Sequence, residues 1–134
     1  MIRPSLVLAR ASLLACLACS SPPPDNPEGP GGPTGAECPL GSTLTYASFA
    51  QNFFKTYCTR CHSSTLSGAA RNGAPPERNF DTYSGISTTD AALIDSVAAA
   101  GPAGINTFMP RNDPRPSNAA RYQLGEWLAC HEPP

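Results

Sequence analysis

Apolar residues recur at helical spacing in the stretch that follows Thr45. The residues in question are Phe49, Ala50, Phe53, Phe54 and Tyr57. Positions three and four apart share one face of an α-helix, and Thr is a favoured residue at the position that caps a helix. The pattern therefore predicts an amphipathic helix over residues 46–57, with Thr45 as its N-cap.

A second helix is predicted from Thr89-Asp90 onward. Its apolar positions are Leu93, Ile94 and Val97. The pattern continues to Ala100, and Gly101-Pro102 should end it because neither residue continues a helix well. Before it, residues 79–86 are expected to form only a short helical turn.

The last helix is predicted to begin after Ser117. Its apolar positions are Ala120, Leu124, Trp127 and Leu128, and Gly125 is expected to let another helix approach closely. No stretch of the chain alternates apolar and polar residues with the period of a strand. The sequence therefore predicts an all-α domain over residues 38–134, with short helices and few large apolar side chains.

The first residues have the pattern of an export signal. The basic residues Arg3 and Arg10 precede an apolar stretch through Leu17 that is too short for the about 20 residues of a membrane-spanning helix. Residues 13–19 read Leu-Leu-Ala-Cys-Leu-Ala-Cys and resemble the lipobox of bacterial lipoproteins. The resemblance implies a signal peptide over residues 1–19 and a lipid on Cys16, with Cys19 as the alternative; an ordinary cleaved signal without lipid remains open.

Residues 20–37 differ in composition from the segment after residue 37. They hold six Pro and four Gly in eighteen residues, with no apolar periodicity. Such a chain buries too little apolar surface to offset its ordering entropy, so a disordered linker is expected. At about 3.1 Å per residue, it would hold the domain up to roughly 55 Å from its anchor.

The six Cys of the chain serve more than one purpose, and one pair carries the chemistry. Cys58-Thr59-Arg60-Cys61-His62 is Cys-x-x-Cys-His, the attachment signature of c-type haem. The two thiols can each reach one vinyl group of the same porphyrin, and the adjacent imidazole can bind its iron. A thiol redox pair, a structural zinc site and a plain disulfide are the alternatives. No strand pattern precedes Cys58, no second ligand pair exists, and a disulfide leaves His62 unexplained.

A second axial ligand is expected for the haem iron, commonly Met or His. Met1 is lost with the signal and His62 is taken, which leaves Met109 and His131. Met109 follows Gly104 and precedes Pro110 in a stretch without helical pattern, which favours it as the ligand, and Phe108 could cover the haem edge. A core Met is the alternative reading. His131 is expected at the surface near the end of the chain.

The order of these features resembles monohaem class I cytochromes c over residues 38–134. In that family a helix precedes Cys-x-x-Cys-His, a Met loop follows, and a C-terminal helix closes the domain against the first. The resemblance rests on residues 58–62 and on Met109-Pro110. It implies a cytochrome c-like fold around one covalent haem c, and a backbone carbonyl, here that of Pro75, that orients His62.

Cys38 and Cys130 bracket the predicted domain. Both are expected in an oxidising compartment, where a disulfide between them would be stable. The role of this disulfide would be stability rather than catalysis. Two free thiols are the alternative.

The formal net charge of −1 gives no footprint for a nucleic-acid partner. The expected function is electron transfer rather than catalysis, with no small-molecule substrate, and the alternatives are a haem-based sensor or gas-binding module and a peroxidase. Redox proteins of the cell envelope are the expected partners. A periplasm-facing lipoprotein is expected, in the outer membrane rather than the inner, because no Asp follows Cys16 or Cys19.

Four arginines are candidates for pairing with haem propionates, although a solvated role is expected for any one of them: Arg60, Arg71, Arg78 and Arg111.

Overall fold

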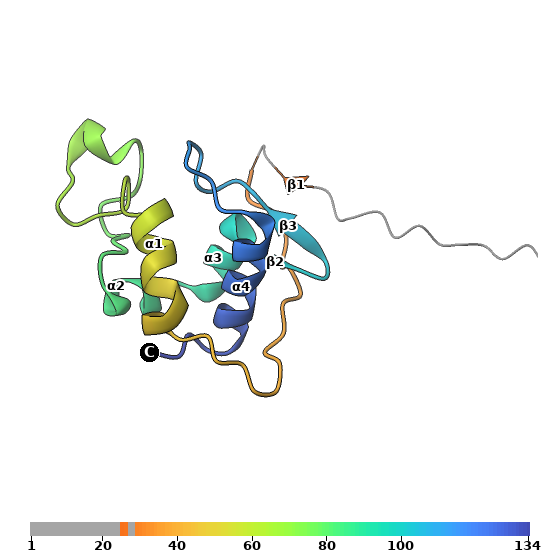
Figure 1. Ribbon diagram of the computed structural model, residues 1–134. Coiled ribbons are helices and arrows are strands. Elements are labelled where there is room, and N and C mark those ends of the chain that lie inside the picture. Colours follow the sequence, from red (N-terminus) through yellow and green to blue (C-terminus); the bar gives the residue numbers. More distant parts are fainter. Residues whose placement is uncertain (1–24, 27–28) are drawn as a thin grey trace, which may run out of the picture.

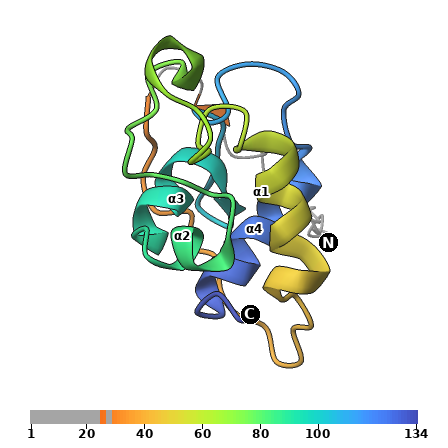
Figure 2. The ribbon, with the colours of Figure 1, turned by 90° about the vertical axis from the view of Figure 1, so that its left-hand side faces the viewer.

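Helices make up most of the regular structure in the computed structural model, which describes residues 25–26 and 29–134. In chain order they are η1 (Tyr46–Ala50), α1 (Gln51–Tyr57), η2 (Gly68–Arg71), α2 (Tyr83–Ser87), α3 (Ala91–Ala98) and α4 (Asn118–Ala129). Figures 1 and 2 show α1 and the loop after it on one side of the molecule, facing α3 and α4. The mostly helical architecture agrees with the predicted fold class at this coarse level.

The first predicted helix is present at its predicted bounds. It begins as one π-helical turn, η1, and continues as α1 to Tyr57. The Thr45 side chain accepts a hydrogen bond from the Ser48 amide at 3.1 Å, and the Ser48 hydroxyl accepts one from the Thr45 amide at 2.9 Å. This reciprocal pair satisfies two of the amides that a helix leaves without partners at its start.

Asp90 and Ser117 cap α3 and α4 as predicted. However, α3 ends at Ala98 rather than at Ala100. The chain turns extended at Ala99, and the next two residues enter a small sheet. The short turn expected over residues 79–86 is α2, which Thr82 caps.

The all-α prediction did not include a small sheet. β1 (Asp25–Asn26), β3 (Gly104–Asn106) and β2 (Ala100–Gly101) form a sheet in that order. β1 runs parallel to β3, and β2 runs antiparallel to it, with Ala100 opposite Ile105. Strands of two or three residues are too short to show a period-two pattern, which is why the sequence did not reveal them.

Aromatic side chains form the core between the first and last helices. The ring of Phe54 on α1 lies 6.1 Å from that of Trp127 on α4 and 5.3 Å from that of Phe80, both edge-on. Leu124 and Ile94 complete the contact from α4 and α3, and both are buried. The core thus joins α1 to the C-terminal helix.

Gly125 does allow a close approach, but to a strand instead of a helix. A Cβ atom built at this position would lie 2.3 Å from the Ala100 carbonyl oxygen and 2.9 Å from the Cβ of Ala36. The absence of a side chain lets α4 lie directly against the backbone of β2.

Residues 29–36, which we call the strap, lie against the domain. Thr34 is 1% exposed, and its amide and hydroxyl donate to the two carboxylate oxygens of Asp95 on α3, at 2.8 and 2.6 Å. The Gly31 amide donates to the Ser96 carbonyl at 2.6 Å, and the Asn106 side chain donates to the Gly32 carbonyl at 3.0 Å. The prediction of a disordered linker over residues 20–37 must be corrected for the strap. There, hydrogen bonds to the domain hold the backbone in place of water.

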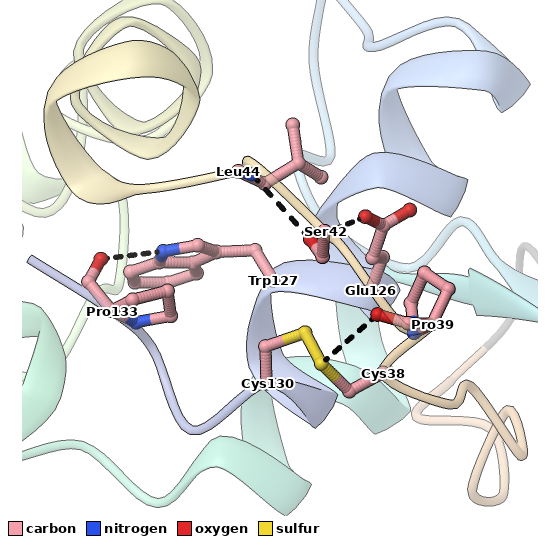
Figure 3. The surroundings of a disulfide bond; sticks show 8 residues. All are labelled: Cys38, Pro39, Ser42, Leu44, Glu126, Trp127, Cys130 and Pro133. Atoms are coloured by element: carbon pink, nitrogen blue, oxygen red, sulfur yellow. Dashed lines mark hydrogen bonds between the residues drawn. A yellow bond between two sulfur atoms is a disulfide. The ribbon is translucent and has the colours of Figure 1, made fainter.

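Cys38 and Cys130 form a disulfide, with their Cα atoms 4.8 Å apart (Figure 3). It joins the segment after the strap to the end of α4. Beside it, the Ser42 hydroxyl donates to Glu126 at 2.6 Å. The C-terminal residues are also fixed, since the Pro133 carbonyl accepts from the indole of Trp127 at 3.0 Å and from the Tyr46 amide at 2.7 Å.

The candidate lipidation sites, Cys16 and Cys19, lie outside the described residues. Within the part of the chain that is described, no helix combines the length and apolar character that crossing a membrane requires.

Candidate haem site

One cavity of about 440 Å³ collects the residues that the sequence singled out. Cys58, Cys61, His62 and Met109 all line it, although Met109 is far from the other three in sequence. The first three follow α1 directly, and Met109 lies on the loop between β3 and α4. The fold thus brings two segments that are distant in sequence to the same cavity.

The cavity wall is largely aromatic and aliphatic. Its large apolar side chains are Phe53, Phe54, Phe80, Leu93, Ile94, Val97, Phe108 and Leu124. A pocket of this size with an apolar lining and a few polar groups is typical of a cofactor site. The lining fits a flat apolar group that is fixed at a few points.

The turn after α1 places the two thiols and the imidazole on the cavity. Cys58 is the C-cap of α1, and its carbonyl accepts from the Cys61 amide at 3.1 Å and from the His62 amide at 2.9 Å. These bonds close a tight helical turn, so Cys58 and Cys61 reach the cavity from adjacent turns. Both are half-buried free thiols.

Burial raises the pKa of the Cys58 thiol to about 12; the charge of Arg121 lowers this pKa and Cys61 raises it further. Redox-active thiols have lowered pKa values, because the thiolate is the reactive form. The raised pKa therefore favours the thiol form of Cys58 over the thiolate.

The orientation of His62 is set by a backbone carbonyl. Its Nδ1 lies 3.2 Å from the Arg78 carbonyl oxygen, which can only accept, so Nδ1 carries the proton and Nε2 keeps a lone pair with which it can bind a metal. The ring also stacks on Phe80, with centroids 4.8 Å apart. Pro75 was predicted for this role, but its carbonyl accepts from Arg71 instead, at 2.6 Å.

Burial lowers the pKa of His62; its hydrogen bond to Arg78 opposes this shift, and the charges of Arg71 and Arg78 add to it. The imidazole is therefore held in its neutral form. Only that form binds a metal ion.

Met109 is held through its backbone. Its amide donates to the Val97 carbonyl at 2.8 Å, and its carbonyl accepts from Arg121 at 2.9 Å. Arg121, on α4, is 1% exposed and also donates to the Ala98 and Asn106 carbonyls, each at 2.7 Å. Arg121 was not predicted from the sequence, although its place three residues before Leu124 was a signal that it faces the core.

His131 lies apart from this site. It follows α4, is exposed and does not line the cavity. Of the two candidates for the second axial ligand, only Met109 shares the cavity with His62.

The four arginines differ in their surroundings. Arg60, Arg78 and Arg111 line the cavity, whereas Arg71 is 5% exposed and its guanidinium is bound by the loop over residues 63–79. Arg60 donates to the Asp113 carbonyl, and the guanidinium of Arg111 lies 4.7 Å from the ring centre of Phe108. Arg71 is thus a structural residue rather than a candidate for the propionates.

Residues 25–26 and 29–134 hold no cluster of three or more His, Cys, Asp or Glu side chains suited to a metal ion. A structural zinc site requires four such protein ligands. Haem needs fewer, because the porphyrin supplies four nitrogen ligands and the protein only the axial ones. Two free thiols, a neutral imidazole and a thioether on one apolar cavity therefore fit haem c.

No protein-family model matches the chain. Neither the curated proteins nor the solved structures include a match to it.

Proposed function

We propose that this protein is a c-type cytochrome, an electron carrier with one covalent haem c and no substrate to transform. The observation that supports this most is the convergence of Cys58, Cys61, His62 and Met109 on one apolar cavity. Met109 and His62 come from separate segments, so their meeting is a property of the fold. Attachment and ligation of haem c give each of these four groups a role.

The residues of the chain have distinct tasks in this proposal. Cys58 and Cys61 would each hold the porphyrin through a thioether, formed by addition of S–H across one vinyl double bond with no net oxidation. Nε2 of His62 and the thioether of Met109 bind the iron. When bound, haem supplies an iron that accepts and releases one electron. With His62 and Met109 as its protein ligands, this iron would change oxidation state with little rearrangement.

We also propose a lipid on Cys16, or alternatively on Cys19, that anchors the protein at the periplasmic face of a membrane, the outer membrane in preference to the inner. Export agrees with this chemistry, because c-type haem is attached outside the cytoplasm. Redox proteins of the cell envelope are then its partners.

The test is expression of the full chain with a haem c maturation system. We expect a red protein with one haem per chain by pyridine haemochrome assay and an intact mass increased by one haem. The double variant Cys58→Ala/Cys61→Ala should lose the covalent haem, whereas the matched control Cys38→Ser/Cys130→Ser should keep it. A colourless wild-type protein with unmodified mass would refute the proposal.

Replacement of Met109 tests the axial ligand. The wild-type protein should be low-spin with the long-wavelength Met–iron band, and Met109→Ala should lose that band and bind carbon monoxide rapidly when reduced. His131→Ala is the control and should resemble wild type. If the wild-type protein itself is high-spin and binds carbon monoxide rapidly, the alternative function of a gas-binding sensor is favoured.

A further inference from the structure

Arg71 is a buried cation behind the candidate haem site. Its five N–H groups are shared among six acceptors, which are five backbone carbonyls and the side-chain oxygen of Asn79 at 2.9 Å. None of these six acceptors carries a formal charge. A positive charge is thus held by dipoles in a site that is only 5% exposed.

One of these acceptors is shared with His62. The Arg78 carbonyl oxygen lies 2.9 Å from Nη2 of Arg71 and 3.2 Å from Nδ1 of His62. A carbonyl that accepts from a metal-binding His makes the imidazole a stronger electron donor to the metal. A guanidinium on the same oxygen draws on the same lone-pair density. The carbonyl therefore polarises the Nδ1–H bond less, and His62 donates less electron density through Nε2.

We propose that Arg71 raises the reduction potential of the haem, both through the Arg78 carbonyl that it shares with His62 and through its buried charge. This inference rests on the proposed function. Oxidised haem iron carries one more positive charge than reduced iron, so a nearby buried cation disfavours the oxidised state. Hydrogen bonds to the axial ligand and burial are both recognised determinants of haem potential. Arg71 acts through other groups and is a positioning residue.

Asn79→Asp is the main test, because it places a carboxylate on Arg71 without removing the guanidinium or changing the size of the side chain. We expect the midpoint potential of the holoprotein to fall. At a fixed solution potential the ratio of reduced to oxidised protein should drop about three- to tenfold, which corresponds to about 28–59 mV for a one-electron couple.

Two further variants separate the contributions. Arg71→Lys keeps a positive charge but loses the planar guanidinium that contacts several carbonyls at once. We expect it to lower the potential less than Arg71→Gln, which loses both. Lys55→Gln is the control: it removes an exposed charge on α1, which solvent screens, and should leave the potential unchanged.

The outcomes separate this inference from the proposed function. The role of Arg71 alone would be overturned if the wild-type protein is red and Asn79→Asp has the same midpoint potential. In that case the variant should also keep the circular dichroism and low-spin spectra of the wild type. A wild-type protein without haem would refute both. Because Asn79→Asp leaves Arg71 in place, the test does not depend on whether Arg71 variants fold.

Discussion

At the scale of single residues, Gly125 is a position where the packing leaves no room for a side chain. Its α-carbon faces the Ala100 carbonyl, and an added Cβ would lie 2.3 Å from that oxygen. Backbone cannot move aside as a flexible side chain can. We expect Gly125→Ala to lower the free energy of unfolding by about 1–3 kcal/mol in urea denaturation. Gly104→Ala is the control, since its Cβ would meet nothing within 4 Å.

Glu132 offers a test by pH. Its side chain is 7% exposed, its Oε1 has no hydrogen-bond partner among the described residues, and burial raises its pKa above the ordinary value of 4.5. The folded protein therefore keeps this proton at pH values where the unfolded chain has lost it. Stability from this group is present below pH 4.5 and decreases as the pH rises through the folded pKa.

Glu132→Gln should accordingly raise the free energy of unfolding at about pH 7 and flatten its pH dependence above 4.5. The measurement is urea denaturation at several pH values. Glu77→Gln replaces an exposed carboxylate and should change stability by less than about 0.5 kcal/mol. If the two variants behave alike, the carboxyl of Glu132 is not held in an unfavourable site.

The residues with distinctive chemistry could be predicted from the sequence, whereas the groups that hold and orient them could not. Cys58, Cys61 and His62 form a motif with fixed spacing, and Met109 was one of two remaining candidates for the sixth ligand. The acceptor for His62 is a backbone carbonyl, which every residue carries and no sequence pattern marks. The prediction of Pro75 in place of Arg78 failed for that reason.

At the scale of elements, the strap depends on Thr34. Its hydroxyl donates to Asp95 at 2.6 Å, so Thr34→Val would leave a carboxylate oxygen without this donor in a buried contact. A hydrogen bond to a charged group contributes about 1.5–3 kcal/mol. We expect a loss of that size in urea denaturation, and faster hydrogen exchange at the amides of the strap.

Thr43→Val is the matched control for the strap, because Thr43 is exposed and the change in shape is the same. An equal effect of the two substitutions would contradict the role of Thr34 in fixing the strap.

Helices were predicted better than the segments between them. Each predicted helix has several apolar residues at regular spacing and a capping residue, so local sequence determines it. The strap and the strands lack such a pattern; Thr34 and Asn106 are held by partners on α3 that are distant in sequence. A composition rich in Pro and Gly predicts disorder only when no such partners exist.

At the scale of the whole molecule, the disulfide joins residues 92 positions apart. In the chain-entropy model, closing a loop of this size lowers the conformational entropy of the unfolded chain. This stabilises the folded state by about 4–5 kcal/mol. Cys38→Ser/Cys130→Ser should lose up to this amount of stability in urea denaturation while keeping its haem. A double variant as stable as wild type would show that the contacts of the C-terminal residues suffice.

The pairing of β1 with β3 also limits how far the domain can lie from a lipid anchor. A free linker up to residue 37 would permit an operating radius of roughly 55 Å. Because β1 pairs with β3 at Asp25, only the nine Cα–Cα steps from Cys16 to Asp25 separate a lipid on Cys16 from the domain. Fully extended, they span about 32 Å. Electrons would then be exchanged close to the bilayer surface, with partners embedded in that membrane or resting on it.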